Sequence, residues 1–151
     1  KYILNKLIDD KKISYINKLY NIPDYKIVLE KKLEKVKDKI IEITKLNSFK
    51  LLSISNINSL VNSKDDVNTV ISYLESEEEL YLLDNSMVLH CNIYKKIKSL
   101  MLKHFANNDM ISVKEFKDIL GISRKYAVPL LEFLDKQRFT ERNGNNRKLY
   151  K

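Results

Sequence analysis

The chain has 151 residues, of which 44% are hydrophobic and 32% are charged, so it has enough apolar material for one or two small domains and is not a disordered tail. It contains two Gly, two Pro and no Trp, a composition that disfavours turn-rich sandwiches and barrels and favours helices with short connections. A single cysteine excludes an intrachain disulfide and fits a reducing, cytoplasmic compartment. No apolar run approaches the roughly 18 residues of a membrane span.

The net charge of +8 is unevenly distributed. Residues 1–90 hold 14 Lys and 14 acidic residues, whereas residues 91–151 hold 14 basic residues and 6 acidic ones. All four Arg lie within residues 124–147, in a chain that otherwise uses Lys. Because guanidinium grips phosphates with two parallel hydrogen bonds, the clustering favours an anionic partner over a merely solvated basic surface.

Residues 1–29 are expected to be the C-terminal remnant of a preceding domain. A helix that carries Ile3, Leu4, Leu7 and Ile8 on one face is predicted, followed by a hairpin of residues 12–16 with residues 25–29. The first residue is Lys rather than Met and no secretory signal follows it, so we expect a fragment of a longer protein.

Residues 30–90 are predicted to form an electrically neutral spacer domain. A helix within residues 30–47 precedes an extended piece at 50–53 and a short helix around Ile57, Leu60 and Val61. Asp65 or Asp66 is expected to cap a third helix, and strands at 79–83 and 86–90 flank a predicted turn at Asp84-Asn85. The predicted buried positions are Leu33, Val36, Ile40, Ile43, Val67, Val70, Ile71 and Leu74.

Residues 91–151 repeat that order with clearer signals. A helix at about 92–107 precedes an extended piece at 110–111, and Ser112 with Glu115 has the spacing of a capping box. Gly121 is expected to end this second helix, and Ser123 to cap the third. The predicted apolar faces comprise Ile93, Ile97, Leu100, Met101 and Phe105; Val113, Phe116, Ile119 and Leu120; and Ala127, Leu130, Leu131 and Leu134.

A hairpin closes the chain, with Asn143-Gly144 as the predicted turn between residues 138–142 and 147–150. Helix, short strand, helix, helix and hairpin is the order of a winged helix. The fold class predicted for the whole chain is therefore mainly α with small β-hairpins (α+β), arranged as tandem winged-helix, or helix-turn-helix, domains.

No catalytic constellation is present in the sequence. No Gly-rich phosphate loop occurs, and His90, Cys91 and His104 do not have the spacing of a metal site or a nucleophilic dyad. The acidic run Glu75, Glu77, Glu78 and Glu79 fits a solvated helix end better than a metal site. We therefore expect a binding module without catalytic activity, cofactor or metal of its own.

The start of the third helix in residues 91–151 is the candidate binding surface. Ser123, Arg124, Lys125 and Tyr126 form its first turn, where free amides and the helix dipole favour an anion. Tyr126 could stack on an exposed base or pack inward. Arg142 and Arg147 flank the hairpin tip, so helix start and wing could clamp a phosphate backbone together.

Pro129 breaks a local rule, because it lies inside the predicted third helix and removes a backbone hydrogen bond at a cost of about 3 kcal/mol. Such a violation indicates either a functional shape or a helix that begins later.

The run at 122–135, Ile-Ser-Arg-Lys-Tyr-Ala-Val-Pro-Leu-Leu-Glu-Phe-Leu-Asp, followed by Arg-Phe-Thr-Glu-Arg-Asn-Gly at 138–144, resembles the C-terminal end of bacterial selenocysteine-specific elongation factors (SelB). Residues 115–121 also resemble that family's second helix. The resemblance implies tandem winged helices, the last of which binds the selenocysteine insertion (SECIS) hairpin of an mRNA to recode UGA. GTP and Mg would belong to N-terminal domains missing here, and the ribosome and selenocysteinyl-tRNA would be partners of the parent protein.

By the family pattern, Arg124 is the first candidate for an RNA contact, with Ser123, Lys125 and Tyr126 beside it. The further candidates carried over are Arg142, Asn143, Gly144, Arg147 and Lys117, with Lys95 and Lys114 as weaker electrostatic ones. Glu141 departs from the family, many members of which have a basic residue there.

The residues leave two other classes of function open. A DNA-binding winged helix would insert its third helix into a major groove, normally as a dimer; Pro129 and the lack of a dimer helix disfavour it, and we expect a monomer. A protein-docking winged helix would not need basic residues at the helix start.

Overall fold

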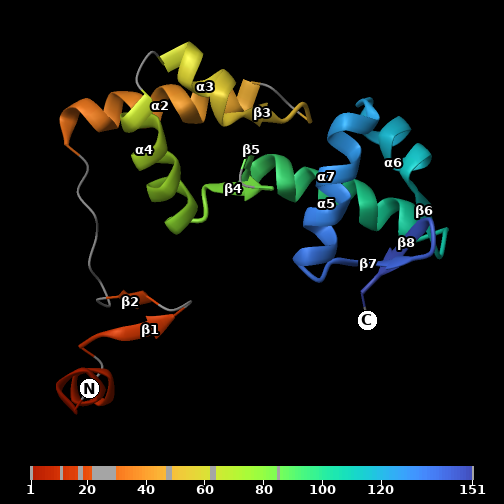
Figure 1. The fold of residues 1–151 in the computed structure, drawn as a ribbon. Helices are drawn as coiled ribbons and strands as arrows, with labels where there is room; N and C mark the ends of the chain where they lie inside the picture. Colours follow the sequence, from red (N-terminus) through yellow and green to blue (C-terminus); the bar gives the residue numbers. More distant parts are fainter. Residues whose placement is uncertain are drawn as a thin grey trace. The chain divides into compact units, whose positions relative to one another are not determined.

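The structure is a computed structural model that describes residues 2–10, 12–16, 19–21, 30–46, 49–61, 64–84 and 86–150. It contains two compact units, Lys1–Glu30 and Lys31–Lys151, and each is described by itself. Figure 1 traces the chain from one terminus to the other. Among the described residues, no helix has both the length and the apolar character needed to cross a membrane.

The first unit contains a helix and a small hairpin. Helix α1 (Tyr2–Asp9) lies where the sequence predicted it, and β1 (Ser14–Ile16) pairs antiparallel with β2 (Leu19–Asn21). The predicted hairpin partner at 25–29 lies outside the described residues, and the partner of β1 that the structure describes is β2. Pairing with the nearer strand closes a shorter loop, which costs less chain entropy.

The first winged helix of the second unit consists of α2 (Lys31–Leu46), β3 (Leu52–Ser53), α3 (Ile54–Val61), α4 (Lys64–Ser76), β4 (Leu80–Leu83) and β5 (Met87–His90). Its strands form an antiparallel sheet in the order β3-β5-β4. The three helices and this sheet enclose a core of Ile40, Ile57, Val67, Val70, Ile71, Leu74, Leu80 and Val88. The periodic apolar positions predicted in α4 are all buried.

Three local predictions for this winged helix need comment. Helix α4 already begins at Lys64, so neither Asp65 nor Asp66 occupies the cap position. Both instead lie in the first turn, where the helix dipole favours acidic residues. Leu60, one of the apolar residues that mark the second helix in the sequence, lies in α3 but is 49% exposed, one residue before that helix ends. The predicted turn residue Asn85 lies outside the described residues.

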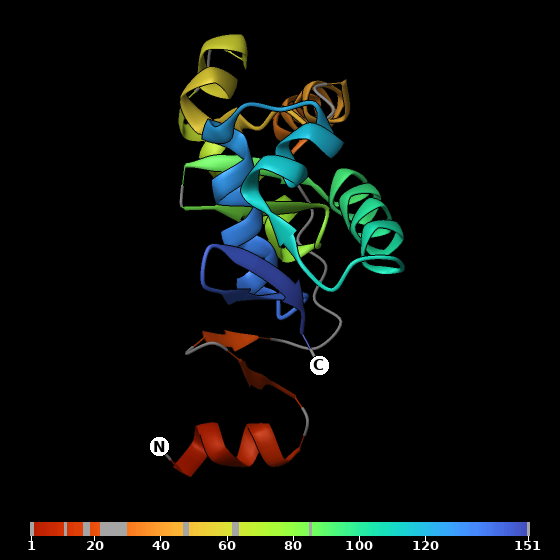
Figure 2. The ribbon, with the colours of Figure 1, turned by 90° about the vertical axis from the view of Figure 1, so that its right-hand side faces the viewer.

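The last winged helix consists of α5 (Cys91–Phe105), β6 (Ile111–Ser112), α6 (Val113–Leu120), α7 (Arg124–Lys136), β7 (Thr140–Asn143) and β8 (Asn146–Leu149). Its strands form an antiparallel sheet in the order β6-β8-β7. Figure 1 shows α7 crossing α5, and Figure 2 shows the β7-β8 hairpin at one end of α7. The element order predicted for residues 30–90 and 91–151 is confirmed.

Local signals in this winged helix are mostly confirmed. The side chain and backbone bonds of the capping box between Ser112 and Glu115 are both present, and Gly121 ends α6 in the left-handed region with φ of 64°. Ile119 was predicted to be buried but is 37% exposed, since the eight-residue helix α6 turns only Phe116 and Leu120 fully inward.

The hairpin turn is shifted by one residue from its predicted position. Asn143 pairs with Asn146, so the two-residue loop is Gly144-Asn145 rather than Asn143-Gly144. Gly144 has a φ of 61°, and Asn145 does not have a positive φ. That pattern matches a type II′ turn, which requires Gly only at the first loop position.

Pro129 does not delay or end the third helix. Helix α7 runs without interruption from Arg124 to Lys136 with Pro129 inside it. The carbonyl that loses its amide donor belongs to Lys125, which is exposed in the first turn. Water can therefore take the place of the missing donor, which lowers the cost of the proline.

Part of the first winged helix packs into the apolar core of the last one. Leu51, Leu83 and Leu89 of the first belong to the same buried cluster as Ile97, Leu131 and other core residues of the last. Strand β5 ends at His90 and α5 begins at Cys91, so no linker separates them. The domain boundary predicted at residue 90 stays a prediction. The predicted spacer, residues 30–90, is packed against the last winged helix.

Three aromatic rings mark this contact. Tyr81 of β4, Tyr94 of α5 and Phe133 of α7 lie with ring centroids 5.1 to 5.5 Å apart. Burial raises the pKa of both tyrosines, so their hydroxyls stay neutral over the physiological range.

Candidate functional site

The first turn of α7 is open to solvent. Ser123 occupies the cap position with extended backbone, but its side chain makes no capping hydrogen bond. The Ser123 carbonyl accepts from the amides of Tyr126 and Ala127, which leaves the amides before them in the first turn without a carbonyl partner, as at any helix start. Ser123, Arg124 and Lys125 are all exposed. This end of α7 therefore presents a hydroxyl, helix amides and two cations.

The other two helix starts in this winged helix are already occupied by side chains. The Nδ1 atom of His90 accepts from the amide of Asn92 at 3.0 Å and caps α5. The Oγ atom of Ser112 accepts from the amide of Glu115 at 3.2 Å, and the Glu115 carboxylate accepts from the Ser112 amide at 2.8 Å. The Ser112 hydroxyl also donates to the Glu115 carboxylate at 2.6 Å, and this bond, followed by the one from the Ser112 amide, holds the pKa of Glu115 below its usual value.

The hairpin places its charged side chains on two different faces. Arg142 lies opposite Arg147 in the β7-β8 register, and Glu141 lies opposite Lys148. Because neighbouring residues in a strand point to opposite faces, the two arginines share one face and the Glu141–Lys148 pair occupies the other. Two like charges directly across a strand pair repel, so the arginine face needs a counter-charge.

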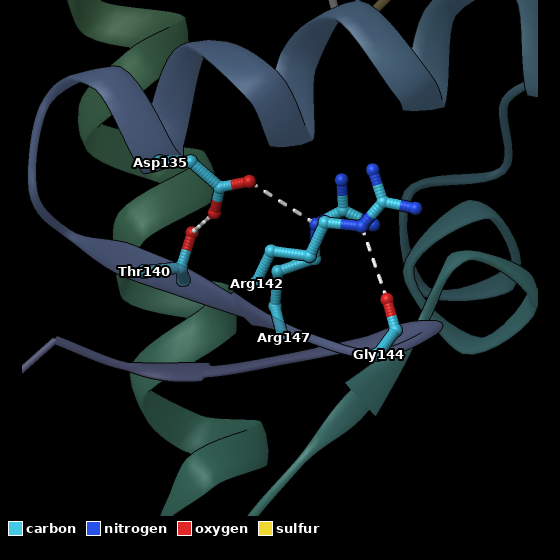
Figure 3. Close-up of polar contacts among 5 residues, drawn as sticks. All are labelled: Asp135, Thr140, Arg142, Gly144 and Arg147. Atoms are coloured by element: carbon cyan, nitrogen blue, oxygen red, sulfur yellow. Dashed lines mark hydrogen bonds and ion pairs between the residues drawn. The ribbon is translucent and has the colours of Figure 1, made fainter.

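Asp135 of α7 supplies that counter-charge (Figure 3). Its Oδ2 atom lies 3.2 Å from Nε of Arg147, and its Oδ1 atom accepts from the hydroxyl of Thr140 at 2.6 Å. The Arg147 side chain is only 6% exposed. The contact joins both hairpin strands to the C-terminal half of α7 and compensates one of the two arginines.

Arg142 is held differently and keeps its charge available. Its Nε atom donates to the Gly144 carbonyl at 3.0 Å, within the hairpin itself. Figure 3 shows its guanidinium next to that of Arg147, between the hairpin and α7. On the other hairpin face, Lys148 lies 3.1 Å from the Glu141 carboxylate. The acidic residue that departs from the family pattern is therefore neutralised by its cross-strand partner.

A groove of about 610 Å³ lies between the hairpin, α6 and α7. Its lining residues are Ser112, Val113, Lys114, Arg124, Val128, Glu132, Arg142, Asn145, Asn146 and Arg147. Four cations from α6, the start of α7 and both hairpin strands therefore face one concavity. Two carboxylates, Glu132 in the groove and Asp135 behind Arg147, offset part of this charge.

The structure brings most of the predicted residues to this groove. Arg124, Arg142 and Arg147 line it, and so does Lys114. Ser123, Lys125 and Tyr126 lie on the adjoining first turn of α7, and Asn143 and Gly144 lie at the hairpin tip. Tyr126 is half-buried against the core and Lys125 lies over its ring. Tyr126 thus packs largely inward, which is one of the two alternatives that the sequence left open.

Two predicted residues lie elsewhere. Lys117 is half-buried in α6, 3.6 Å from the carboxylate of Asp118, and does not line the groove. Lys95 lies on α5. Arg147, which was predicted as a contact of the wing, is turned by the register toward α7, where it is buried against Asp135.

Six groove residues were not among the predicted contacts, and two of them, Ser112 and Val113, were assigned only to the cap and the apolar face of α6. Val128 and Glu132 follow Arg124 at helical spacing on α7, and this periodicity could have identified them. Asn145 and Asn146 required the correct turn position. Among the described residues, no three His, Cys, Asp or Glu side chains gather as a metal site would require.

The fold and the groove define a class: a tandem winged-helix module with a cationic groove between the start of its third helix and its wing. Residues 103–149 match the family model described as "Elongation factor SelB, winged helix". The resemblance found in the sequence is therefore confirmed for residues 103–149, which make up most of the last winged helix.

One curated protein and two solved structures are also similar to the chain. The chain is 38% identical over 47 residues to the selenocysteine-specific elongation factor of Desulfomicrobium baculatum, covering 31% of this chain and 7% of that protein. The structure of the mRNA-binding domain of SelB from E. coli in complex with SECIS RNA matches with a TM-score of 0.71 at 15% identity, over 82% of this chain and 100% of that chain.

A second solved structure matches the chain over nearly its whole length. The crystal structure of the bacterial selenocysteine-specific elongation factor EF-Sec has a TM-score of 0.63 at 20% identity, over 99% of this chain and 23% of that one. At these identities the two structures establish the fold. The chain thus corresponds to a small part of these elongation factors.

Proposed function

We propose that this chain is the C-terminal mRNA-binding part of a selenocysteine-specific elongation factor, and that it binds the SECIS hairpin so that UGA is recoded during translation. The observation that carries the proposal is the convergence of Lys114, Arg124, Arg142 and Arg147 on one groove, within the segment that matches the SelB winged helix.

The geometry suits the backbone of a structured RNA. A-form RNA has a deep and narrow major groove that a helix cannot enter, so an RNA hairpin is held by its phosphates and by unstacked loop or bulge bases. The open start of α7 provides amides, Ser123 and Arg124 for one phosphate. Arg142 provides a guanidinium from the opposite wall for a second one.

The proposal extends to the site residues and to the parent protein. Ser123, Arg124, Lys125, Tyr126, Arg142, Asn143 and Gly144 are proposed RNA contacts, and Arg147 is proposed to position the wing from behind. The parent protein would supply GTP and Mg binding and contact the ribosome and selenocysteinyl-tRNA in the cytoplasm, with this part a monomer. Residues 1–29 would be the end of a preceding winged helix, and residues 30–90 and 91–151 the next two.

The test is a fluorescence anisotropy titration of the 151-residue chain with a bulged, looped RNA hairpin from a selenoprotein message. Wild-type protein should prefer this hairpin to a duplex DNA of equal length, with about two to four counterions released. Arg124→Ala should weaken hairpin binding by about 1–3 kcal/mol, or roughly 5- to 150-fold.

Arg138→Ala is the matched control. Arg138 is also an exposed arginine, but it follows the far end of α7 and does not line the groove. It removes the same charge without touching the site, so its hairpin affinity should stay within about twofold of wild type. Equal losses for Arg124→Ala and Arg138→Ala, or equal binding of hairpin and DNA, would contradict the proposal.

A further inference from the structure

Helix α5 carries a second basic surface, away from the groove. It has four lysines, Lys95, Lys96, Lys98 and Lys103, and no acidic residue. Together with Ser99, Leu102 and Ala106, three of them line a shallow depression of about 570 Å³ along the helix. This depression shares no residue with the groove between α6, α7 and the hairpin.

Helix α2 shows that this charge pattern is not general to the chain. It has six lysines, but Glu34, Asp38 and Glu42 are interleaved with them. Its Lys32 lies 2.8 Å from the carboxylate of Asp66, and Lys39 donates to the carbonyl of Leu60 at 2.6 Å. Mixed charge of this kind is typical of a solvated helix face.

The lysines of α5 do not have such partners. Over the part of the chain that the structure describes, no carboxylate pairs with any of the four. Lys98 is half-buried, and its Nζ atom lies 5.5 Å from the ring centroid of Tyr94 and 5.0 Å from that of Phe139. Two aromatic faces thus fix one amino group in place while its charge stays uncompensated.

We propose that the α5 face is a second RNA-binding surface, which contacts the phosphate backbone without reading sequence. The nine residues from Lys95 to Lys103 span about 12 Å of helix, at 1.5 Å for each of the eight steps. A nucleic-acid duplex carries one phosphate per strand for roughly every 3.4 Å of its axis, so the face covers about three phosphates. Lysine suits this task because it acts as a point charge rather than a bidentate fork.

The composition of the face disfavours other anionic partners. Membrane-surface helices need a broad apolar side, and Leu102, 51% exposed, is the one large apolar residue lining this depression. Protein interfaces rely on aromatic or arginine anchors, and the depression contains neither. Small Ser99 and Ala106 leave room for a backbone to lie close to the helix.

Figure 2 shows α5 along one edge of the last winged helix, and none of the residues that line the groove comes from α5. An RNA held in the groove and another RNA segment on α5 would therefore contact different elements. This proposal goes beyond hairpin recognition and does not depend on which hairpin the groove accepts.

The test uses an unlooped, perfectly paired RNA duplex of 16 base pairs and the full chain. The protein carries Arg124→Ala and Arg142→Ala, which disable the groove. Its binding to the duplex is measured from about 0.05 to 0.3 M salt, a range that includes physiological ionic strength. Adding Lys95→Gln/Lys103→Gln should reduce the salt slope by about 1–2 and weaken binding at 0.1 M salt by roughly 8-fold for one lost contact, or about 60-fold for two.

Lys31→Gln/Lys35→Gln in the same background is the control. Both residues are exposed on α2, and the double variant removes the same net charge. It should change duplex affinity by less than about threefold. Equal effects of the two pairs, no duplex binding in the groove-disabled background, or equally effective competition by a polyglutamate peptide would each overturn the proposal. The preference for the RNA hairpin is measured in the separate anisotropy titration. Failure of the proposed hairpin site can therefore be distinguished from failure of the proposed α5 surface.

Discussion

Removing the Asp135 carboxylate should destabilise the last winged helix far more than removing a similar carboxylate on the hairpin surface. Asp135→Ala leaves the guanidinium of Arg147, which is 6% exposed, without its counter-charge and deprives Thr140 of its acceptor. Breaking a buried pair on one side costs about 3–5 kcal/mol. Because the Asp135 side chain is itself 23% exposed, water can screen part of the loss, and we expect about 2–4 kcal/mol.

Urea unfolding of the full chain measures this free energy. Glu141→Ala is the matched control, because Glu141 and Lys148 are 39% and 42% exposed on the opposite face of the same hairpin, and an exposed pair contributes at most about 1 kcal/mol. The double variant Asp135→Leu/Arg147→Met should recover most of the loss, since it leaves no unpaired buried charge. If Asp135→Ala costs no more than Glu141→Ala, the role assigned to this contact is wrong.

Three further predictions concern stability. Burial, followed by the charge of Lys45, lowers the pKa of His90 below its usual 6.5. The free energy of unfolding should therefore be highest above pH 6.5 and fall as the pH drops below that value. His90→Asn keeps a capping side chain and should lose this pH dependence in melting curves at pH 7.5 and 5.5. Ser112→Ala should cost about 1 kcal/mol in urea unfolding, whereas Ser123→Ala should cost clearly less, because only Ser112 makes a cap bond; equal costs would contradict the assigned caps. Phe133→Ala, at a 6% exposed ring, should cost about 3–5 kcal/mol, against under about 0.5 kcal/mol for exposed Leu102→Ala.

The sequence predicts the features that depend on neighbouring residues. The capping box at Ser112, the left-handed Gly121 and the buried stripe of α7 all follow from spacing within one or two helical turns, and all are present. The order of helices and strands follows from the same local patterns, so the tandem winged helix was predictable without any long-range information.

Features set by pairing register were harder to predict. Arg142 and Arg147 look equivalent in the sequence, yet a one-residue shift of the turn and a carboxylate on α7 give one a buried partner and leave the other available. Lys114 was given little weight because its helix was not known to face the hairpin. The groove forms only when α6, α7 and the hairpin pack together. The spacing of residues along the chain does not predict that packing.

The direct passage from β5 into α5 fixes the rotational phase of the last winged helix. His90 ends the strand and caps the helix at once, so one residue inserted after it would turn α5 by about 100° relative to the strand. That rotation would carry Tyr94 away from Tyr81 and Phe133. The number of residues at the junction of β5 and α5 is therefore constrained as strictly as their identity. Insertions should be tolerated in the hairpin loops instead.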